Sequence, residues 1–303
     1  MKNRILAASK IHESALKKAK EFAEVDVKLD PSEDELVRII GDYDAIMVRS
    51  KPTVTRRVIE AAKKLKVIGR AGVGLDNVDV DAARQRGVVV VNSPEASSIS
   101  VAEHTFALIL SLLRHIPKAD RTMREGKWEK KLVGNELYGK RLGIIGFGRI
   151  GKEVALRAGA FGMTVVAHDP AMTSEDIREY NATLVDLGEL LRTSDIVSLH
   201  VPALPSTRDL INAKTISLMK PTSFLINASR GHAIDEEALC AAIRDRRIAG
   251  AALDVYKKEP LENSPLLNLE NVVLTPHLGA NTDEAQINAG TVIVEKIRHI
   301  LSK

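Results

Sequence analysis

Residues 142–151 read LGIIGFGRIG, and residues 164–169 read TVVAHD. The first stretch joins an apolar run, typical of a buried strand, to a full G-x-G-x-x-G motif. Apolar residues at helical spacing predict a helix over 152–161, and residues 164–167 predict a second strand. Asp169 ends this strand 18 positions after Gly151, close to the ~20 expected of a dinucleotide fold. Strand, glycines, helix, strand and acid in this order predict a site for a dinucleotide.

Each of these residues has a physical role in such a site. Gly146 permits a tight turn out of the strand, Gly148 lets the backbone approach a pyrophosphate, and Gly151 lets helix and sheet pack closely. The helix directs its free N–H groups and the positive end of its dipole at the phosphates. Asp169 can accept hydrogen bonds from the ribose hydroxyls, and the residues after it are Pro and Ala rather than Arg. Because a carboxylate would repel a 2′-phosphate, the sequence favours NAD over NADP.

Composition places the chain among ordinary globular proteins. Its 303 residues are enough for one or two domains, and 45% of them are hydrophobic. The net charge of +4, with a pI of about 9.0, would suit an anionic substrate or nucleic acid. However, Lys and Arg are scattered, and aromatic residues make up only 3% of the chain, too few to stack on bases. A solvated surface explains the charge better, and we expect no nucleic-acid partner.

The single cysteine and the apolar runs limit the cellular context. Cys240 cannot form an intrachain disulfide, a cysteine-based zinc site is excluded, and its apolar helical surroundings predict a core position. The apolar run at residues 5–8 is too short for a signal peptide, and residues 106–113, the longest apolar stretch, are too few to span a membrane. We therefore expect a soluble cytoplasmic protein with no metal and no membrane partner.

A complete α/β unit precedes the glycine motif. Strands are predicted at residues 5–8, 25–29, 45–48, 67–69 and 88–91, with helices between them. One helix starts at Ser32, where Ser32 and Glu35 form a capping box that satisfies exposed N–H groups reciprocally. Alternating strands and helices imply a parallel sheet covered by helices.

Two clusters follow strands of this unit, at the carboxyl ends where open α/β sheets bind ligands. The first is Arg49, Ser50 and Lys51, and the second is residues 69–74, GRAGVG. The glycines of the second cluster could direct consecutive N–H groups at an anion. A solvated strand end and a plain turn are the alternatives, so the residues alone leave a substrate-anion role open.

Residues 100–113 predict a buried helix between the two α/β units. Ser100 and Glu103 have the spacing of a second capping box, and residues 106–113 are apolar nearly all round. Such a helix either crosses between domains or packs against a partner subunit. Trp128, the only tryptophan, lies in a polar run and fits an interface or the core equally well.

Strands and helices alternate again after the glycine motif. Strands are predicted at residues 196–199, 224–227, 249–253 and 272–274, and each ends in polar or Pro-containing residues that should line the cofactor edge. Residues 282–302 predict a final helix, with Thr282 as N-cap and an apolar stripe that includes Ile293 and Ile297. This helix could return to the first α/β unit and make it discontinuous.

Hydride transfer between NAD and a hydroxy acid needs a cation for the carboxylate, a base for the hydroxyl proton and a group that tunes the base. Arg230 can bind a carboxylate through two parallel N–H donors, and His277 carries an imidazole, which titrates near neutrality. Glu259 can hold that imidazole and favour its protonated form. A lone Arg or His beside a loop is more often structural, but three such groups at strand tips beside an NAD fold favour catalysis. His168 and His200, also at strand tips, are interpreted as structural neighbours of the cofactor.

These motifs together resemble the D-isomer-specific 2-hydroxyacid dehydrogenase family over nearly the whole chain. The similarity is carried by VRS at 48–50, GRAGVGLDNVD at 69–79, GKWE at 126–129, GFGRIG at 146–151, NASRG at 227–231, AALDV at 251–255 and PHLGA at 276–280. Together they are far more specific than the glycine motif alone. The resemblance implies an α/β fold with two doubly wound parallel-sheet domains. Residues 1–95 and 279–303 would form a smaller, discontinuous substrate-binding domain, and residues 96–278 an NAD-binding Rossmann domain.

The resemblance also assigns the site residue by residue. Arg230, Glu259 and His277 match the catalytic residues, and Asp254 matches the residue that meets the nicotinamide carboxamide. The positions that match cofactor contacts are Gly146, Gly148, Arg149, Ile150, Gly151, Asp169, Val201, Pro202, Ala228, Ser229, Arg230, Asp254, His277, Gly279 and Ala280. The positions that match the substrate side are Arg49, Ser50, Gly72, Val73 and Gly74.

The activity implied is NAD-dependent oxidation of a small anionic 2-hydroxy acid. The expected substrate is 3-phospho-D-glycerate, oxidised to 3-phosphohydroxypyruvate in serine biosynthesis, with Arg49 as the candidate for phosphate recognition. A related reductase of glyoxylate or hydroxypyruvate is the alternative, and an NAD-sensing, corepressor-like interaction protein is a less favoured third. Family members are commonly dimeric or tetrameric through the nucleotide domain, which implies a homodimer or homotetramer.

Three features depart from the family pattern. Ser97 stands where relatives often carry Asn near the substrate, and Val73 replaces a frequent Thr. The chain ends at Lys303 without the additional regulatory domain of serine-inhibited members, so no feedback by serine through such a domain is expected.

Overall fold

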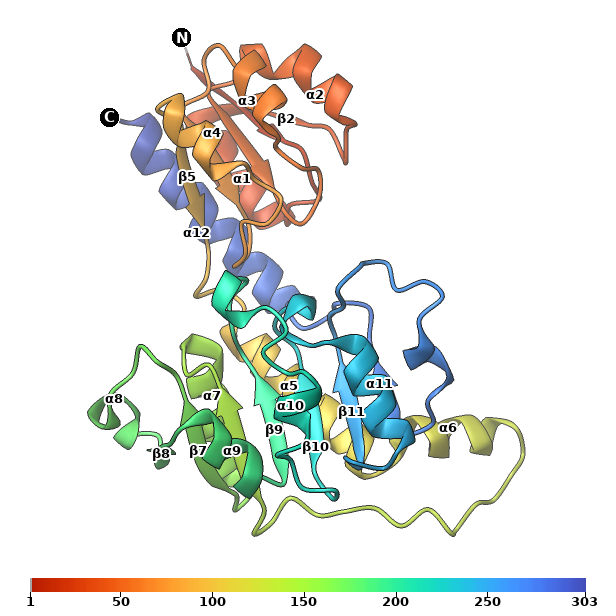
Figure 1. The fold of residues 1–303 in the computed structure, drawn as a ribbon. Helices are drawn as coiled ribbons and strands as arrows, with labels where there is room; N and C mark the ends of the chain where they lie inside the picture. The colour runs from red at the N-terminus through yellow and green to blue at the C-terminus, as the bar shows by residue number, and fades with distance from the viewer. Residues whose placement is uncertain (1) are drawn as a thin grey trace. The chain divides into compact units, whose positions relative to one another are not determined.

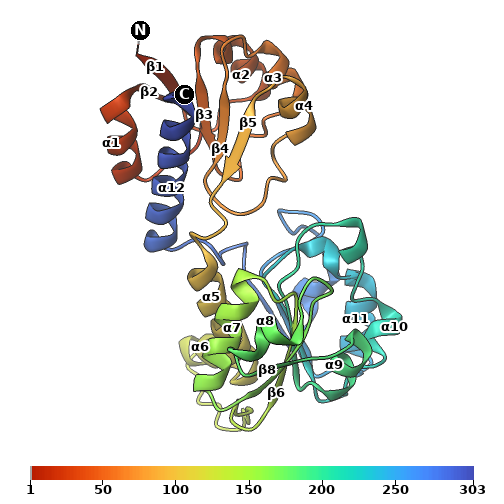
Figure 2. The same cartoon turned by 90° about the vertical axis from the view of Figure 1, so that its left-hand side faces the viewer.

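The computed structural model describes residues 2–303, which divide into two compact units. Unit 1 comprises residues 2–98 and Ala280–Lys303, and unit 2 comprises Ile99–Gly279. Each unit contains one parallel sheet covered by helices (Figure 1, Figure 2). The predicted fold class, two doubly wound parallel-sheet domains, is confirmed.

The sheet of unit 1 has five parallel strands in the order β2-β1-β3-β4-β5. The order reverses between β1 and β3, so the carboxyl ends of these two strands form a topological switch point. The strands are β1 (Asn3–Ala7), β2 (Ala23–Val27), β3 (Ala45–Val48), β4 (Val67–Arg70) and β5 (Val89–Asn92). The helices are α1 (Glu13–Phe22), α2 (Glu33–Ile39), α3 (Arg56–Ala61), α4 (Val80–Gln85) and α12 (Asp283–Leu301).

The last helix, α12, belongs to unit 1 although it ends the chain. Thr282 caps it as predicted, because its side chain accepts a hydrogen bond from the N–H of Ala285. Ile293 and Ile297 are fully buried on β4, where a Cβ on Gly69 would lie 2.6 Å from the Ile293 side chain. Figure 2 shows α12 beside α1, with which it packs. The helix therefore completes the first α/β unit.

The sheet of unit 2 has seven parallel strands in the order β12-β11-β10-β9-β6-β7-β8. Here the order reverses between β6 and β9, which gives a second switch point. The strands are β6 (Arg141–Ile145), β7 (Thr164–His168), β8 (Ala182–Leu184), β9 (Ile196–Leu199), β10 (Phe224–Asn227), β11 (Gly250–Leu253) and β12 (Val272–Leu274). The helices are α5 (Ser98–Leu113), α6 (Ile116–Arg124), α7 (Arg149–Ala160), α8 (Ser174–Arg178), α9 (Leu187–Thr193), α10 (Ala213–Ile216) and α11 (Glu236–Arg244).

Alternate residues of these strands enter two separate cores, one on each face of the sheet. Leu142 and Ile144 of β6 pack with residues of α5 and α7, whereas Ile145 packs with residues of α9 and α11. The strands are buried on both faces, as expected for a parallel sheet. Cys240 of α11 is 3% exposed and lies in the second core, which confirms its predicted core position.

The predicted strands are all present, and their ends lie within two residues of the predicted ones. The edge strand β8 was not predicted, because none of its three residues is buried and they carry no apolar run. The capping box of Ser32 and Glu35 is confirmed at the start of α2. The predicted burial of residues 106–113 is also confirmed, since most of these side chains lie in the core.

Two predictions near α5 are wrong. α5 begins at Ser98, so Ser100 lies inside the helix and does not cap it. Its Oγ instead donates to the carbonyl oxygen of Gly279 at 2.8 Å, a partner far along the chain. Trp128 is 73% exposed, so its core alternative is also wrong.

Among residues 2–303, no single helix has the length and apolar character needed to cross a membrane. The pair α5 and α6 reaches that length and composition together, with a bend of 63° between them.

Candidate active site

The predicted cofactor edge is one side of the seven-stranded sheet. Because all strands are parallel, the segments that follow β6, β7, β9, β10, β11 and β12 meet at their common carboxyl edge. The glycine motif, Asp169, Arg230, Glu259 and His277 all lie in these segments. The tertiary fold therefore gathers residues from Gly146 to His277 at one edge of the sheet.

The glycine motif forms a turn that larger residues could not make. Gly146 has a φ of 91°, and a Cβ on it would lie 2.5 Å from the carbonyl oxygen of His200 after β9. A Cβ on Gly151 would lie 2.4 Å from the carbonyl oxygen of Gly146, so α7 starts directly on the turn. By contrast, nothing lies within 4 Å of the position of a Cβ on Gly148. The protein's own packing does not require glycine there, which leaves open space for a ligand at the start of α7.

The start of α7 is suited to an anion. Its N-cap residue is Gly148, which supplies no side-chain acceptor for the first N–H groups of this 12-residue helix. These N–H groups and the helix dipole favour a phosphate at this position. Arg149 and Ile150 form the first turn, and both keep exposed surface.

Asp169 ties the end of β7 to the glycine turn. Its Oδ2 accepts a hydrogen bond from the N–H of Phe147 at 2.8 Å, and its Oδ1 accepts one from the N–H of Ala171 at 2.9 Å. The carboxylate thus lies beside the glycine motif.

Asn227, the last residue of β10, builds the turn that presents Arg230. Its Oδ1 accepts hydrogen bonds from the N–H and Oγ of Ser229, at 3.0 and 2.8 Å, and its Nδ2 donates to the carbonyl oxygen of Arg230 at 3.0 Å. The Arg230 guanidinium donates to the carbonyl oxygen of Ser229 at 2.8 Å. Our sequence reasoning did not include Asn227 among the site residues, although an Asn just after a buried strand is a signal for an Asx-turn.

Gly231 brings the turn of Arg230 against the loop after β11. A Cβ on Gly231 would lie 1.9 Å from the backbone carbonyl carbon of Tyr256, so only glycine fits. Tyr256 is itself fixed, because its hydroxyl donates to the carbonyl oxygens of Leu253 and Thr275, at 3.1 and 2.9 Å. Burial raises the pKa of this tyrosine to about 12. The contact places the loop that carries Glu259 next to the turn of Arg230.

Glu259 and His277 are in direct contact. Oε2 of Glu259 lies 2.8 Å from Nδ1 of His277, and Oε1 accepts a hydrogen bond from the N–H of Tyr256 at 3.2 Å. Because an ionised carboxylate can only accept, Nδ1 carries the proton and Nε2 of a neutral ring keeps its lone pair. Half of the His277 side chain is exposed, so the ring is accessible. The structure thus joins two of the three predicted catalytic residues and places Arg230 at the adjacent strand end.

Asp254 is 1% exposed, and its carboxylate already has several partners. Oδ1 accepts hydrogen bonds from Oγ1 of Thr275 and the N–H of Leu278, at 2.6 and 2.8 Å, and Oδ2 accepts one from the N–H of Gly279 at 2.8 Å. Burial by itself raises the pKa of Asp254, but hydrogen bonds from His104, Thr275 and the two N–H groups outweigh it and hold the pKa below its ordinary value. Asp254 therefore holds the loop of His277. The sequence reasoning missed His104.

His168 and His200 both form hydrogen bonds within unit 2. Nδ1 of His168 lies 3.2 Å from the carbonyl oxygen of Val185, and Nε2 of His200 lies 2.9 Å from Oγ of Ser198. Burial lowers the pKa of His200 to about 3, so its ring is neutral. Both contacts agree with a structural role for these histidines.

The remaining predicted cofactor positions follow strands of unit 2 or lie at its boundary with unit 1. Val201 and Pro202 follow β9, and Ala228 follows β10. Gly279 is the last residue of unit 2, and Ala280 is the first residue of the segment that returns to unit 1. Among residues 2–303, no group of three His, Cys, Asp or Glu side chains could hold a metal ion.

In unit 1, Arg49 lies at the switch point between β1 and β3. Its N–H donates to Oγ of Ser9, which follows β1, at 2.8 Å, and its carbonyl oxygen accepts from Nδ2 of Asn77 at 2.8 Å. Its Nη1 donates to Oε1 of Gln286 at 3.3 Å, and no carboxylate of the described chain lies within ion-pair distance. Burial lowers the pKa of Arg49. A half-buried guanidinium without a carboxylate partner is suited to an anionic ligand.

The glycine cluster after β4 offers fewer N–H groups than expected. The N–H of Gly72 already donates to Oγ of Ser93 at 2.8 Å, so this N–H has a partner within the protein. Gly72 has a φ of 138°, and a Cβ there would lie 1.6 Å from the Arg70 guanidinium. The N–H groups of Val73 and Gly74 have no acceptor among the described residues. Ser50 is exposed, and Ser97 is buried.

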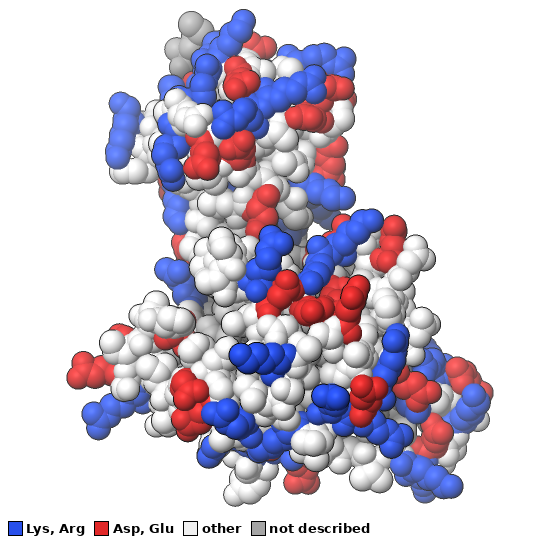
Figure 3. Space-filling view, in the orientation of Figure 1, with Lys and Arg blue, Asp and Glu red and all other residues white. Residues whose placement is uncertain are grey.

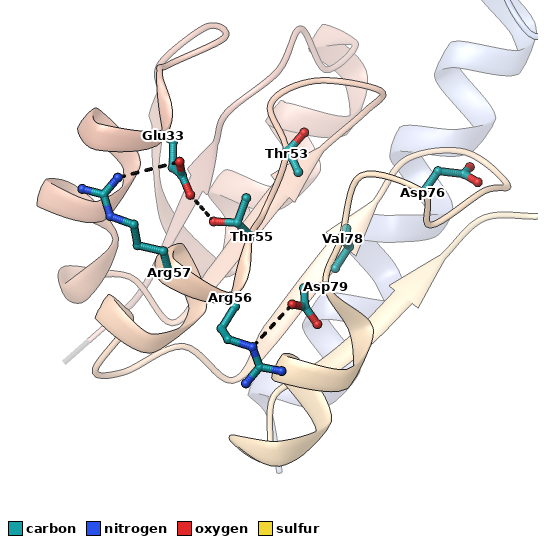
Figure 4. Close-up of a pocket in the computed structure, with 8 residues that line it drawn as sticks. All are labelled: Glu33, Thr53, Thr55, Arg56, Arg57, Asp76, Val78 and Asp79. Atoms are coloured by element: carbon teal, nitrogen blue, oxygen red, sulfur yellow. Dashed lines mark hydrogen bonds and ion pairs between the residues drawn. The ribbon is translucent and has the colours of Figure 1, made fainter. Parts of the chain in front are cut away.

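A pocket of about 490 Å³ in unit 1 contains none of the predicted site residues. Its lining pairs each arginine with an acid: Arg57 with Glu33, and Arg56 with Asp79 (Figure 4). These cations are already neutralised, so the pocket is less suited to an anion than Arg49. Figure 3 shows basic and acidic side chains interspersed over each unit on the visible face, without a continuous basic stripe.

Several known proteins are similar to this chain in sequence and fold. The model of the D-isomer specific 2-hydroxyacid dehydrogenase NAD binding domain matches residues 106–279. A D-3-phosphoglycerate dehydrogenase from Synechocystis is 49% identical over 299 residues, which are 98% of this chain and 54% of that protein. A hydroxypyruvate reductase from Thermotoga maritima is 50% identical over 269 residues, or 87% of each protein.

A crystal structure of a protein from Thermus thermophilus has the same fold. It superposes with a TM-score of 0.92 at 35% identity and covers 99% of this chain and 97% of that one. The chain spans about half the length of the D-3-phosphoglycerate dehydrogenases that it matches.

Proposed function

The chain belongs to the D-isomer-specific 2-hydroxyacid dehydrogenase family, and we propose that it oxidises 3-phospho-D-glycerate to 3-phosphohydroxypyruvate with NAD. This reaction would supply serine biosynthesis in the cytoplasm. The observation that carries the proposal is the contact of Glu259 with His277 on a unit with the NAD-binding fold. The match of nearly the whole chain to D-3-phosphoglycerate dehydrogenases supports the choice of substrate.

The catalytic residues act on the 2-hydroxyl and the carboxylate of the substrate. Nε2 of His277 accepts the hydroxyl proton, while its Nδ1–H donates to Glu259, whose charge stabilises the imidazolium that forms. Arg230 binds the carboxylate through parallel N–H donors. NAD, when bound, supplies the acceptor for the hydride from C2. In the reverse direction, the imidazolium of His277 returns the proton to the carbonyl oxygen.

The residues that would hold NAD fit its chemistry. The N–H groups at the start of α7 suit the pyrophosphate, and the open space beside Gly148 admits it. Asp169 suits the adenosine ribose, and no cation follows it to receive a 2′-phosphate. This assignment extends to the other predicted cofactor positions at the same edge.

Arg49 is the proposed phosphate-binding residue of unit 1. Its half-buried guanidinium has an amide partner, Gln286, but no carboxylate partner, so a phosphate would supply the missing counter-charge. The unpaired N–H groups of Val73 and Gly74 are the second proposed contribution to anion binding.

Reduction of hydroxypyruvate is the second candidate. It is supported by the Thermotoga maritima reductase, which is 50% identical to this chain over 269 residues. Both reactions use the same acid–base residues, and they differ in whether the substrate carries a phosphate for Arg49.

The deciding measurement is NADH oxidation by the purified chain with 3-phosphohydroxypyruvate, hydroxypyruvate and glyoxylate. We expect the highest kcat/KM for the phosphorylated acid. Arg49→Gln should lower that value by about 10- to 100-fold, the worth of a hydrogen bond to a charged group, and leave hydroxypyruvate nearly unaffected. Arg38→Gln, at an exposed arginine of α2, is the matched control. Equal rates with all three acids would instead indicate a 2-oxo acid reductase with a broad substrate range.

We also propose a homodimer or homotetramer that forms through unit 2. Apolar side chains are exposed along α6 and the segment after it, including Met123, Trp128, Val133 and Tyr138. A second copy of the chain would cover them. Light scattering after size exclusion tests this: a monomer at micromolar concentration contradicts the proposal, and Trp128→Glu should weaken an oligomer that forms.

A further inference from the structure

Two side chains of α5 hold the two ends of the loop that carries His277. His104 Nε2 lies 3.2 Å from Oγ1 of Thr275, at the start of the loop, and Ser100 Oγ donates to the carbonyl oxygen of Gly279, at its end, at 2.8 Å. Ser100 and His104 are four positions apart, so they lie on the same face of the helix, one turn from each other. The helix thus presents two polar groups to the loop from a mostly apolar, buried face.

His104 also contacts Asp254, the acid after β11 to which this loop is hydrogen-bonded. Its Nε2 lies 3.2 Å from Oδ1 of Asp254, which accepts the hydroxyl proton of Thr275 at 2.6 Å. Oδ1 can only accept, and the Thr275 proton is already directed at it, so both atoms near Nε2 are acceptors. The network therefore requires the tautomer of His104 with a proton on Nε2.

The backbone of His277 depends on this network. His277 has a φ of 57°, in the left-handed region, which costs a residue other than glycine about 1 kcal/mol or more. The N–H groups of His277, Leu278 and Gly279 donate in turn to the carbonyl oxygen, Oδ1 and Oδ2 of Asp254, at 2.9, 2.8 and 2.8 Å. Three successive hydrogen bonds to one residue hold the strained turn in place.

We propose that His104 is a positioning residue for His277. Its Nε2–H fixes Asp254 and Thr275. These residues in turn hold the left-handed turn of His277 and keep its ring in contact with Glu259. The inference rests on the proposed role of His277 as the catalytic base. It assigns to α5 a function in catalysis, in addition to its place in the core.

The choice of side chain at position 104 provides a sharp test. In His104→Gln the amide nitrogen reaches about the position of Nε2 and can still donate, whereas in His104→Asn it is too short to do so. His104→Leu removes the donor altogether. His299→Leu, at an exposed histidine of α12, is the matched control. NADH binding by fluorescence and the melting temperature establish that each variant is folded.

Catalysis is measured with whichever of the three oxo acids the unmodified protein reduces fastest. We expect kcat to fall by about 10-fold or more in His104→Leu and His104→Asn, since small misplacements of catalytic groups are costly. His104→Gln should keep kcat within about 3-fold, because it retains the donor that holds Asp254 and Thr275. Normal kcat in both Leu and Asn variants overturns the inference, as does an equal loss in all three.

Hydrogen exchange tests the same inference without activity. The amides of Leu278 and Gly279 should exchange about 10-fold faster or more in His104→Leu and His104→Asn than in His104→Gln, since exchange reports local opening. Equal exchange in all variants overturns the positioning role. If the unmodified protein turns over none of the acids, the proposed function fails while this comparison still decides the role of His104. If the Leu variant does not fold, the Asn and Gln pair decides.

Discussion

Nδ1 of His277 lies 2.8 Å from Oε2 of Glu259, although the two residues are 18 positions apart and belong to different loops. The contact assigns one nitrogen of the ring to the carboxylate and leaves the other for a proton from the substrate. In the proposed mechanism, His277 is the general base and the carboxylate of Glu259 orients its ring.

Replacing His277 by Ala should lower kcat by roughly 10²- to 10⁴-fold, the usual contribution of positioned acid–base catalysis. NADH binding should persist, because the residues proposed to hold the pyrophosphate and the ribose, at the start of α7 and at Asp169, remain unchanged. Steady-state kinetics with NADH and the preferred oxo acid measure the effect, and His299→Ala is the exposed control. A variant with near-normal kcat would remove His277 from the mechanism.

Glu259→Gln should lower kcat less than the loss of His277 does, because the amide oxygen can still accept from Nδ1 but carries no charge to stabilise the imidazolium. The effects of the two substitutions on kcat should also be non-additive. In a His277→Ala background, Glu259→Gln should change kcat by less than about 3-fold, since residues that act as a unit are non-additive. Full additivity in this double-mutant cycle would show that Glu259 acts through another group.

Gly148→Ala should mainly weaken NADH binding, whereas Gly151→Ala should mainly lower the stability of the fold. A Cβ at 148 meets nothing within 4 Å, so the free energy of unfolding should change by about 1 kcal/mol at most, while NADH binding weakens by about 10-fold or more because the methyl group occupies the ligand's approach. A Cβ at 151 would lie 2.4 Å from the carbonyl oxygen of Gly146, so that variant should lose about 1–3 kcal/mol of stability without any cofactor present. Denaturant unfolding and NADH fluorescence distinguish the two. Tight NADH binding by Gly148→Ala would contradict the proposed pyrophosphate site at the start of α7.

Asp169→Ala should weaken NADH more than NADPH. The carboxylate that would accept the ribose hydroxyls is lost, which is worth about 1.5–3 kcal/mol, or about 10- to 100-fold, for NADH. NADPH gains by the removal of a negative charge near its 2′-phosphate. The ratio of kcat/KM for the two cofactors measures the change. The hydrogen bond to the N–H of Phe147 is lost as well, so a melting curve is needed to show that the glycine turn remains folded. An unchanged ratio would mean that other residues select the cofactor.

His200 should make the protein less stable in mild acid. Burial lowers its pKa to about 3, against about 6.5 in the unfolded chain, so the folded state binds fewer protons between these values. The stabilisation from its neutral ring is complete above pH 6.5 and is lost as the pH falls toward 3. At pH 5 the loss is about 2 kcal/mol, since one pKa unit corresponds to about 1.4 kcal/mol.

His200→Gln tests this assignment, because the amide nitrogen can replace Nε2 in the hydrogen bond to Ser198 while it does not titrate. Denaturant unfolding at pH 7 and pH 5 should show a smaller loss of stability in the variant than in the unmodified protein. His299→Gln, at an exposed position, should keep the original pH dependence. Parallel curves for His200→Gln and the unmodified protein would contradict the assigned pKa.

The local features of this protein could be read from the sequence. The glycine turn, the strands on either side of it, the cap at Ser32 and the final helix from Thr282 all depend on residues within a few positions of each other. Buried parallel strands are apolar along their whole length, so they stand out even where their ends are uncertain. The half-exposed β8 lacks that signal and was missed.

The tertiary structure decided how the polar side chains are used. Ser100 has the local pattern of a helix cap, yet its hydroxyl bonds to Gly279, 179 positions away. His104 meets Thr275 across 171 positions, and the N–H of Gly72 is taken by Ser93. A polar group bonds to whichever partner the fold brings within about 3 Å. That partner is set by the packing of the helices on the sheet, so the sequence determined which elements form and the tertiary structure determined which side chains remain available for chemistry.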